Sequence, residues 1–188
     1  MSERINSLVV IDVHGSQCTP SDFECMSAAF TVAAQNDGQV AVLALIDPEI
    51  DVDLNIAPML ISKGADKVFW ASKENLAEHD LGSYVQVVSE AIEKVEPKAV
   101  FLTHNNFGAD LAPRVAFRSR SAMVTSTQAV SFEDKGEMLL TRVCYGGRAE
   151  QVIKPATPTV GVTLREKGFE PLEDNEERVG EGSELGVQ

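Results

Sequence analysis

The chain has 188 residues, of which 44% are hydrophobic and 24% are charged, as in one globular domain with a buried core. Its net charge of −13 would repel phosphate backbones and anionic lipid, which argues against nucleic-acid or membrane-surface binding. No apolar run is long enough to cross a bilayer, and the N-terminal segment reads as a strand, so we expect neither membrane insertion nor a signal peptide.

Short apolar runs alternate with helical segments over roughly the first two thirds of the chain. Continuous runs rich in Val, Ile and Leu predict buried strands at 8–13, 40–47, 66–72 and 98–104. Helical spacing of apolar residues and flanking Pro, Asn or Gly predict helices at 20–37, 53–63, 81–97 and 107–119. Strand and helix thus alternate four times, which indicates parallel strand pairing.

The pattern then changes to consecutive extended segments. These are predicted at 121–134, 137–146 and 149–154, with tight turns at 134–136 and 146–147 and a last strand at 157–165. From Glu173 the chain carries six acidic residues and almost nothing to bury, so 173–188 is predicted to be a disordered acidic tail or linker. Residues 1–172 are expected to form one α/β domain, a mostly parallel sheet flanked by helices with a late antiparallel hairpin.

Polar residues follow three of the predicted parallel strands, at the edge where ligands of such sheets bind. They are 12–15, 47–48 and 103–106. The turn at His14 holds a single glycine, too few for a phosphate fingerprint, so a plain connecting turn is favoured. Asn105, Asn106, Phe107 and Gly108 remain a weak candidate nucleotide edge.

Other reactive residue types lack a catalytic pattern. His79 lies in a polar segment, and His104 is more readily a structural histidine than a general base. Cys144 shares a strand face with Arg142, but a half-buried inert thiol is the preferred interpretation. The three cysteines lack CxxC spacing, which favours reduced thiols in a cytoplasmic protein over a disulfide scaffold or zinc site. We predict no catalytic and no metal-binding residues; a hydrolase using His104 or Cys144 is the weakest alternative.

The helix at 107–119 can be explained without a ligand. Asn106 is predicted to cap it, Asp110 lies near its positive end, and Arg118 and Arg120 lie near its negative end.

Four motifs in order resemble the N-terminal domain of the electron transfer flavoprotein alpha subunit. They are NNFGADLAPRVAFRS, TSTQAVSF, LLTRVCYGGRAEQVI and PTVGVTLREKGFEPL, which cover much of the second half of the chain. Ala109, Ser126-Thr127 and Gly147-Arg148 depart from the family pattern. The family's second, FAD-binding domain has no counterpart in this sequence, so none of its flavin-contacting residues is carried over.

The resemblance implies an adenine nucleotide alpha hydrolase-like fold and a heterodimer with a beta-type subunit. It implies that FAD belongs to the assembled complex rather than to this chain alone, and that the partner could hold AMP. Electrons would pass from flavin dehydrogenases toward a respiratory acceptor. Arg142, Tyr145 and Arg148 are predicted to contact the partner, since aromatic and arginine side chains dominate interfaces; a solvent-exposed turn is the alternative. The competing hypothesis for the whole chain is a stand-alone module that binds AMP or ATP.

Overall fold

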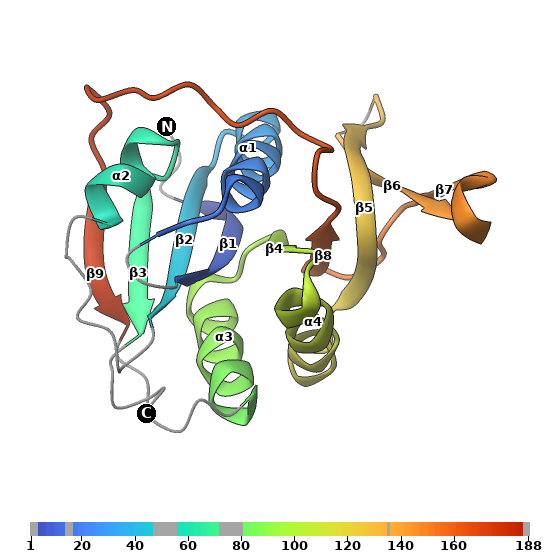
Figure 1. Ribbon diagram of the computed structural model, residues 1–188, viewed down its shortest axis with the longest axis horizontal. Coiled ribbons are helices and arrows are strands. Elements are labelled where there is room, and N and C mark those ends of the chain that lie inside the picture. The colour runs from blue at the N-terminus through green and yellow to red at the C-terminus, as the bar shows by residue number, and fades with distance from the viewer. Residues whose placement is uncertain (1–3, 14–16, 47–55, 72–80, 135, 186–188) are drawn as a thin grey trace.

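The fold is taken from a computed structural model that describes residues 4–13, 17–46, 56–71, 81–134 and 136–185. These residues form a nine-stranded sheet in the order β7-β6-β5-β8-β4-β1-β2-β3-β9. Helices α1 and α2 pack on one face, and α3 and α4 pack on the other (Figure 1). The predicted α/β fold with a mostly parallel sheet between helices is confirmed.

Every neighbouring pair from β5 to β9 along this order is parallel. The strands of this part are β1 Ile5–Val13, β2 Gln39–Ile46, β3 Lys67–Ala71, β4 Ala99–Thr103, β5 Ala122–Phe132, β8 Val160–Leu164 and β9 Glu181–Leu185. The helices are α1 Pro20–Gln35, α2 Ile56–Ser62, α3 Leu81–Val95 and α4 Asn106–Arg118. Residues 53–55 of the predicted second helix lie outside the described residues.

The central strands are buried on both faces, which explains why they read as continuous apolar runs. On β1, Val9 and Ile11 pack toward α1 and α2, whereas Leu8 and Val10 pack toward α3 and α4. Phe101 of β4 has no exposed surface. Each such side chain contributes about 1.5–3 kcal/mol of transfer free energy, so the two cores hold the sheet in a fixed position. None of the described helices has the length and apolar character needed to cross a bilayer.

The predicted antiparallel excursion is also confirmed. Strand β5 pairs with β6 Met138–Cys144, which pairs with β7 Ala149–Ile153 through the 3-10 turn η2 Tyr145–Gly147. We call β6, η2 and β7 the hairpin; it projects from the end of the sheet, away from the helices (Figure 1). The predicted turn at Gly146-Gly147 falls within η2, while the turn at 134–136 includes Lys135, which lies outside the described residues.

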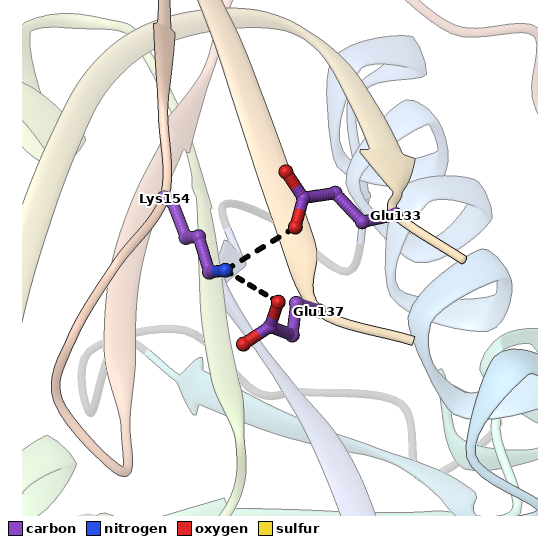
Figure 2. A network of polar contacts seen from close by, with 3 residues as sticks. All are labelled: Glu133, Glu137 and Lys154. Carbon is purple, nitrogen blue, oxygen red and sulfur yellow. Dashed lines mark hydrogen bonds and ion pairs between the residues drawn. The ribbon is translucent and has the colours of Figure 1, made fainter. Parts of the chain in front are cut away.

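One ion-pair network holds the end of the hairpin opposite η2. Lys154, just after β7, pairs with Glu133 at 3.2 Å and with Glu137, and both glutamates flank the connection between β5 and β6. Figure 2 shows the ammonium between the two carboxylates. These contacts raise the pKa of Lys154 and lower the pKa of Glu137. The charges at this end of the hairpin are therefore satisfied within the chain.

The predicted disordered tail is wrong over most of its length. Residues 181–185 form β9, which pairs in parallel with β3, and Leu185 is buried. The chain reaches this edge across α1 and α2: Gly168 N–H donates to Glu24 at 3.2 Å, and Asn175 N–H donates to the Ser62 carbonyl at 3.0 Å. Backbone pairing with an open sheet edge needs no apolar side chains, so composition alone underestimates it.

Arg178 fastens the connection before β9. Its guanidinium bonds to Asp66 at 2.7 Å and to the Ala65 carbonyl at 3.3 Å, and it lies over the Phe30 ring at 5.7 Å. This single basic residue in an acidic segment supplies the ion pair that anchors β9 to the sheet.

Candidate functional site

The carboxyl-edge pocket lies where β1 and β4 end and α1 and α4 begin. It has a volume of about 300 Å³ and is lined by Val10, Asp12, Thr19, Asp22, Leu102, Thr103, Asn105, Asn106, Phe107 and Gly108. All four residues of the predicted nucleotide edge therefore come together here. The parallel strands bring them there, because their carboxyl ends share one edge of the sheet.

The start of α4 is built by Asn105 and Gly108. Asn105 is the N-cap: its backbone is extended, and its side-chain oxygen accepts a hydrogen bond from Gly108 N–H at 2.8 Å. The prediction that Asn106 caps the helix is wrong by one residue, since Asn106 is already helical. A Cβ atom at Gly108 would lie 2.0 Å from the Thr103 carbonyl oxygen, so only glycine allows α4 to approach β4 this closely.

Asp22 is the main buried charge of this pocket, and it serves the fold. One carboxylate oxygen accepts from Thr19 N–H at 2.7 Å and from the Thr19 hydroxyl at 2.8 Å, which closes a capping box on α1. The other oxygen accepts from the Thr103 hydroxyl at 3.1 Å. The hydroxyl of Thr103 is in turn 3.7 Å from the Cys25 sulfur. These bonds tie α1 to the end of β4.

The two thiols beside Asp22 are poor nucleophiles. Burial raises the pKa of Cys25 to about 12, and the negative charge of Asp22 adds to the rise. Burial and Asp22 likewise raise the pKa of Cys18 to about 12. Both thiols therefore stay protonated at neutral pH, and the thiolate needed for nucleophilic or metal chemistry is scarce.

Two acidic residues line the carboxyl-edge pocket among the residues that the structure describes. The carboxylates of Asp12 and Asp22 both line it, and the capping Asn105 takes up one of the free N–H groups at the start of α4. The described part of this edge therefore places negative charge beside the start of α4, the kind of position where nucleotide sites offer unpaired backbone donors.

His104 occupies a structural position at the end of β4. The Nδ1 atom of its ring lies 2.8 Å from the Thr163 hydroxyl, and its backbone N–H donates to the Leu164 carbonyl at 2.8 Å. Thr163 is fully buried and also accepts from Ser126 N–H. His104 thereby joins β4, β8 and β5 rather than facing a nucleophile. His14, Asp47, Pro48 and His79 lie outside the described residues.

A second concave surface, the hairpin groove, lies beside η2. It has a volume of about 820 Å³ and is lined by Arg142, Val143, Cys144, Tyr145, Gly146, Gly147, Ala149, Glu150, Gln151 and Arg165. Two of the predicted interface residues, Arg142 and Tyr145, line it. The third, Arg148, caps η2 and is exposed.

Tyr145 is held in an unusual conformation at the tip of the hairpin. Its φ angle is +52°, in the left-handed region that bulky residues avoid, and its side chain is 84% exposed. Gly146 and Gly147, which follow, also have positive φ angles. Tyr145 therefore combines a strained backbone with an exposed aromatic side chain.

Arg165 lies in this groove and was not predicted to be functional. Its N–H donates to the Thr127 carbonyl at 2.8 Å, which places the residue after β8 against β5. The sequence shows that an arginine follows a strand, but not that the strand neighbours β5. Within the described chain, no group of three or more His, Cys, Asp or Glu residues could hold a metal ion.

The family model for the electron transfer flavoprotein domain matches residues 7–187, nearly the whole chain. The chain belongs to the electron transfer flavoprotein domain family. This confirms the resemblance seen in the four sequence motifs, and the match extends through β9, in keeping with the ordered pairing of that strand.

Three relatives of this chain are named as subunits, two of them with electron transfer in their names. The chain is 28% identical over 173 residues to the electron transfer flavoprotein subunit alpha of Bacillus subtilis (strain 168), covering 92% of this chain and 51% of the relative. It is 30% identical over 162 residues to the lactate dehydrogenase (NAD(+),ferredoxin) subunit LctC of Acetobacterium woodii, covering 86% of this chain and 38% of the relative. The acryloyl-CoA reductase electron transfer subunit beta of Anaerotignum propionicum is 28% identical, and the match covers 55% of this chain and 27% of that relative.

The chain thus spans about half, or less, of the length of these relatives.

Proposed function

We propose that the chain acts as an alpha-type subunit, or the first domain of one, in a flavin-dependent electron-transfer complex. It pairs with a beta-type subunit, and the complex carries electrons from flavin dehydrogenases toward a respiratory acceptor. The proposal rests on the family match and on relatives that are named as subunits. Its own role in this proposal is structural: it presents a docking surface and performs no catalytic step.

The structural observation that supports this proposal is the uncovered face of the hairpin. The register pairs Thr141 with Val152, and alternation puts Leu139 and Val143 on that same face. The opposite face, with Leu140 and Ile153, packs into the core below α1 and α2. This helix-free face carries exposed Val152 and lies next to exposed Tyr145, and aromatic residues are enriched in protein-binding surfaces.

We infer that FAD is not bound at the nucleotide edge predicted from the sequence. The carboxyl-edge pocket measures about 300 Å³, and Asp12 and Asp22 line it where a pyrophosphate would need positive groups. We therefore assign FAD to the assembled complex rather than to this chain alone, and AMP, if present, to the partner. The same carboxylates weigh against the stand-alone AMP or ATP module.

We place the complex in the cytoplasm. All three cysteines, Cys18, Cys25 and Cys144, are free, as expected for thiols kept reduced there.

The test is to purify the tagged chain from its own host and to identify the chains that accompany it by mass spectrometry. We expect a beta-type electron transfer subunit in stoichiometric amount and a flavin absorbance band only in fractions that contain other chains. A lone chain that carries stoichiometric FAD, or that recovers no electron-transfer subunit, would contradict the proposal.

A further inference from the structure

Three strands bring two arginines to one place beside η2. Thr127 of β5 pairs with Arg142 of β6 on one side, and its carbonyl accepts from Arg165 N–H on the other. Both arginine side chains line the hairpin groove. These contacts place Arg142, Thr127 and Arg165 side by side on neighbouring strands. We call these three residues the row.

The polar groups of this row lack part of their hydrogen bonding. Arg142 donates from one terminal nitrogen to the Thr125 hydroxyl at 3.1 Å, but its Nε atom is buried and has no partner. The Thr127 hydroxyl is also buried and unpaired, and Thr127 has no exposed surface. Nearly all buried polar groups in folded proteins find partners, so these two groups beside the hairpin groove are exceptions.

A missing negative charge accompanies the missing acceptor. Within the described part of the chain, no carboxylate lies within ion-pair distance of Arg142, Arg148 or Arg165. Glu150 lines the same groove, but its carboxylate accepts from the Gln128 amide at 2.8 Å. At the other end of the hairpin, by contrast, Lys154 is paired twice. Unpaired arginines cluster here although the whole chain carries a charge of −13.

We propose that the hairpin groove receives an acidic side chain of the partner subunit, whose carboxylate binds between Arg142 and Arg165. A planar carboxylate matches the geometry of a guanidinium group and can accept two parallel hydrogen bonds from it. A protein carboxylate is favoured over a free phosphate because Glu150 already places one negative charge in the wall, and because Val143 and Tyr145 offer apolar contact to a polypeptide. This inference rests on the proposed function and adds a second contact to the uncovered face of the hairpin, because strand alternation places Arg142 on the opposite face, with Leu140.

The test uses the complex with the partner subunit and compares Arg165→Gln, Arg142→Gln and Arg118→Gln. Arg165 is exposed, so its variant should fold normally, and Arg118 on α4 is an exposed control with the same change of charge. We expect each groove variant to weaken the partner's binding about tenfold or more and to flatten its salt dependence, with the control unchanged. Circular dichroism melts of the isolated chains separate misfolding of Arg142→Gln from loss of binding.

A second readout follows the Nε–H group of Arg142 by NMR, with its signal identified by its loss in Arg142→Gln. We expect the signal to shift on addition of the partner and to stay in place on addition of inorganic phosphate. A complex with unchanged affinity in both groove variants, or a shift with phosphate alone, would overturn this inference and leave the proposed function standing. Failure of the wild-type chain to bind any partner would instead contradict the proposed function.

Discussion

Asn105 and Asn106 are neighbours of the same residue type with different roles. Only Asn105 has the extended backbone and the bond to Gly108 N–H that define an N-cap. The sequence predicted a capping asparagine correctly but chose the wrong one, because the two differ only in backbone conformation. That conformation is set by how β4 ends, with His104 N–H bonded to β8.

We predict that Asn105→Ala destabilises the protein by about 1 kcal/mol, because the substitution leaves the Gly108 N–H group at the start of α4 without its hydrogen-bond acceptor. Asn106→Ala is the matched control: both residues are exposed, and Asn106 makes no side-chain hydrogen bond in the described structure. Urea unfolding of the two variants measures the difference. Equal losses of stability would show that the cap is not at Asn105.

Gly108→Ala should cost more, because its Cβ atom would meet the Thr103 carbonyl oxygen at 2.0 Å and push α4 away from β4. We expect a loss of about 1–3 kcal/mol, the usual cost of overpacking. Ala109→Gly, one residue further along on the exposed side of α4, should lose only the helix propensity of about 1 kcal/mol. Thermal unfolding of both variants is the measurement, and a Gly108→Ala protein as stable as wild type would contradict the packing argument.

The reactivity of Cys25 follows from its raised pKa. With a pKa of about 12, the Cys25 thiol is protonated at every pH below that value, and the buried sulfur is also shielded from reagents. We predict that iodoacetamide at mildly alkaline pH leaves Cys25 unmodified in the folded protein and alkylates it in urea. Peptide mass spectrometry checks this, and half-buried Cys144 serves as the internal comparison. Rapid native alkylation of Cys25 would show that the α1–β4 junction opens readily.

At the scale of elements, β9 shows how little local composition decides at a sheet edge. Its residues, EGSEL, include two glutamates and a glycine, which are poor strand formers. The strand forms because β3 offers an unpaired backbone edge, Leu185 enters the core, and Arg178 anchors the approach. The pairing with β3 and the bond between Arg178 and Asp66 both join positions more than 100 residues apart, which no window of the sequence contains.

Arg178→Ala should loosen β9 without unfolding the sheet. The half-buried ion pair with Asp66 and the contact with the Phe30 ring together hold the approach, so we expect the local opening free energy to fall by roughly 1–2 kcal/mol. Hydrogen exchange of the amides at 181–185 should accelerate about tenfold. Lys67→Ala is the control, because its pair with exposed Glu181 at 3.8 Å contributes little. Unchanged hydrogen exchange of these amides in Arg178→Ala would show that other residues hold β9 against β3.

At the scale of the whole molecule, the helices leave the hairpin uncovered at one end of the sheet. Two cores stabilise the central strands, whereas β6 and β7 are supported mainly by β5 and η2. Under the proposed function, this end of the sheet is where we expect another subunit to bind.

Tyr145→Gly separates binding from stability at this end. Glycine adopts a positive φ angle without strain, so the isolated chain should be as stable as wild type or slightly more stable. Partner affinity should fall by about 2 kcal/mol or more if the exposed ring anchors the interface. Isothermal titration with the partner, beside thermal melts of the free chain, measures both quantities. Full affinity in this variant would show that the Tyr145 ring does not contact the partner and that the tip of the hairpin is a solvent-exposed turn.

The order of elements, the strands with two buried faces and the capped α4 are all readable from the chain, because each depends on residues within about one helix or strand of one another. The approach of Arg142 to Arg165, the pairing of β9 with β3 and the exact cap of α4 are not. They depend on which strands become neighbours and in what register. The hydrogen bonds between strands join backbone groups, and the local sequence does not specify which strand a given backbone will pair with. Strand order is therefore what turned two separate arginines into one candidate site.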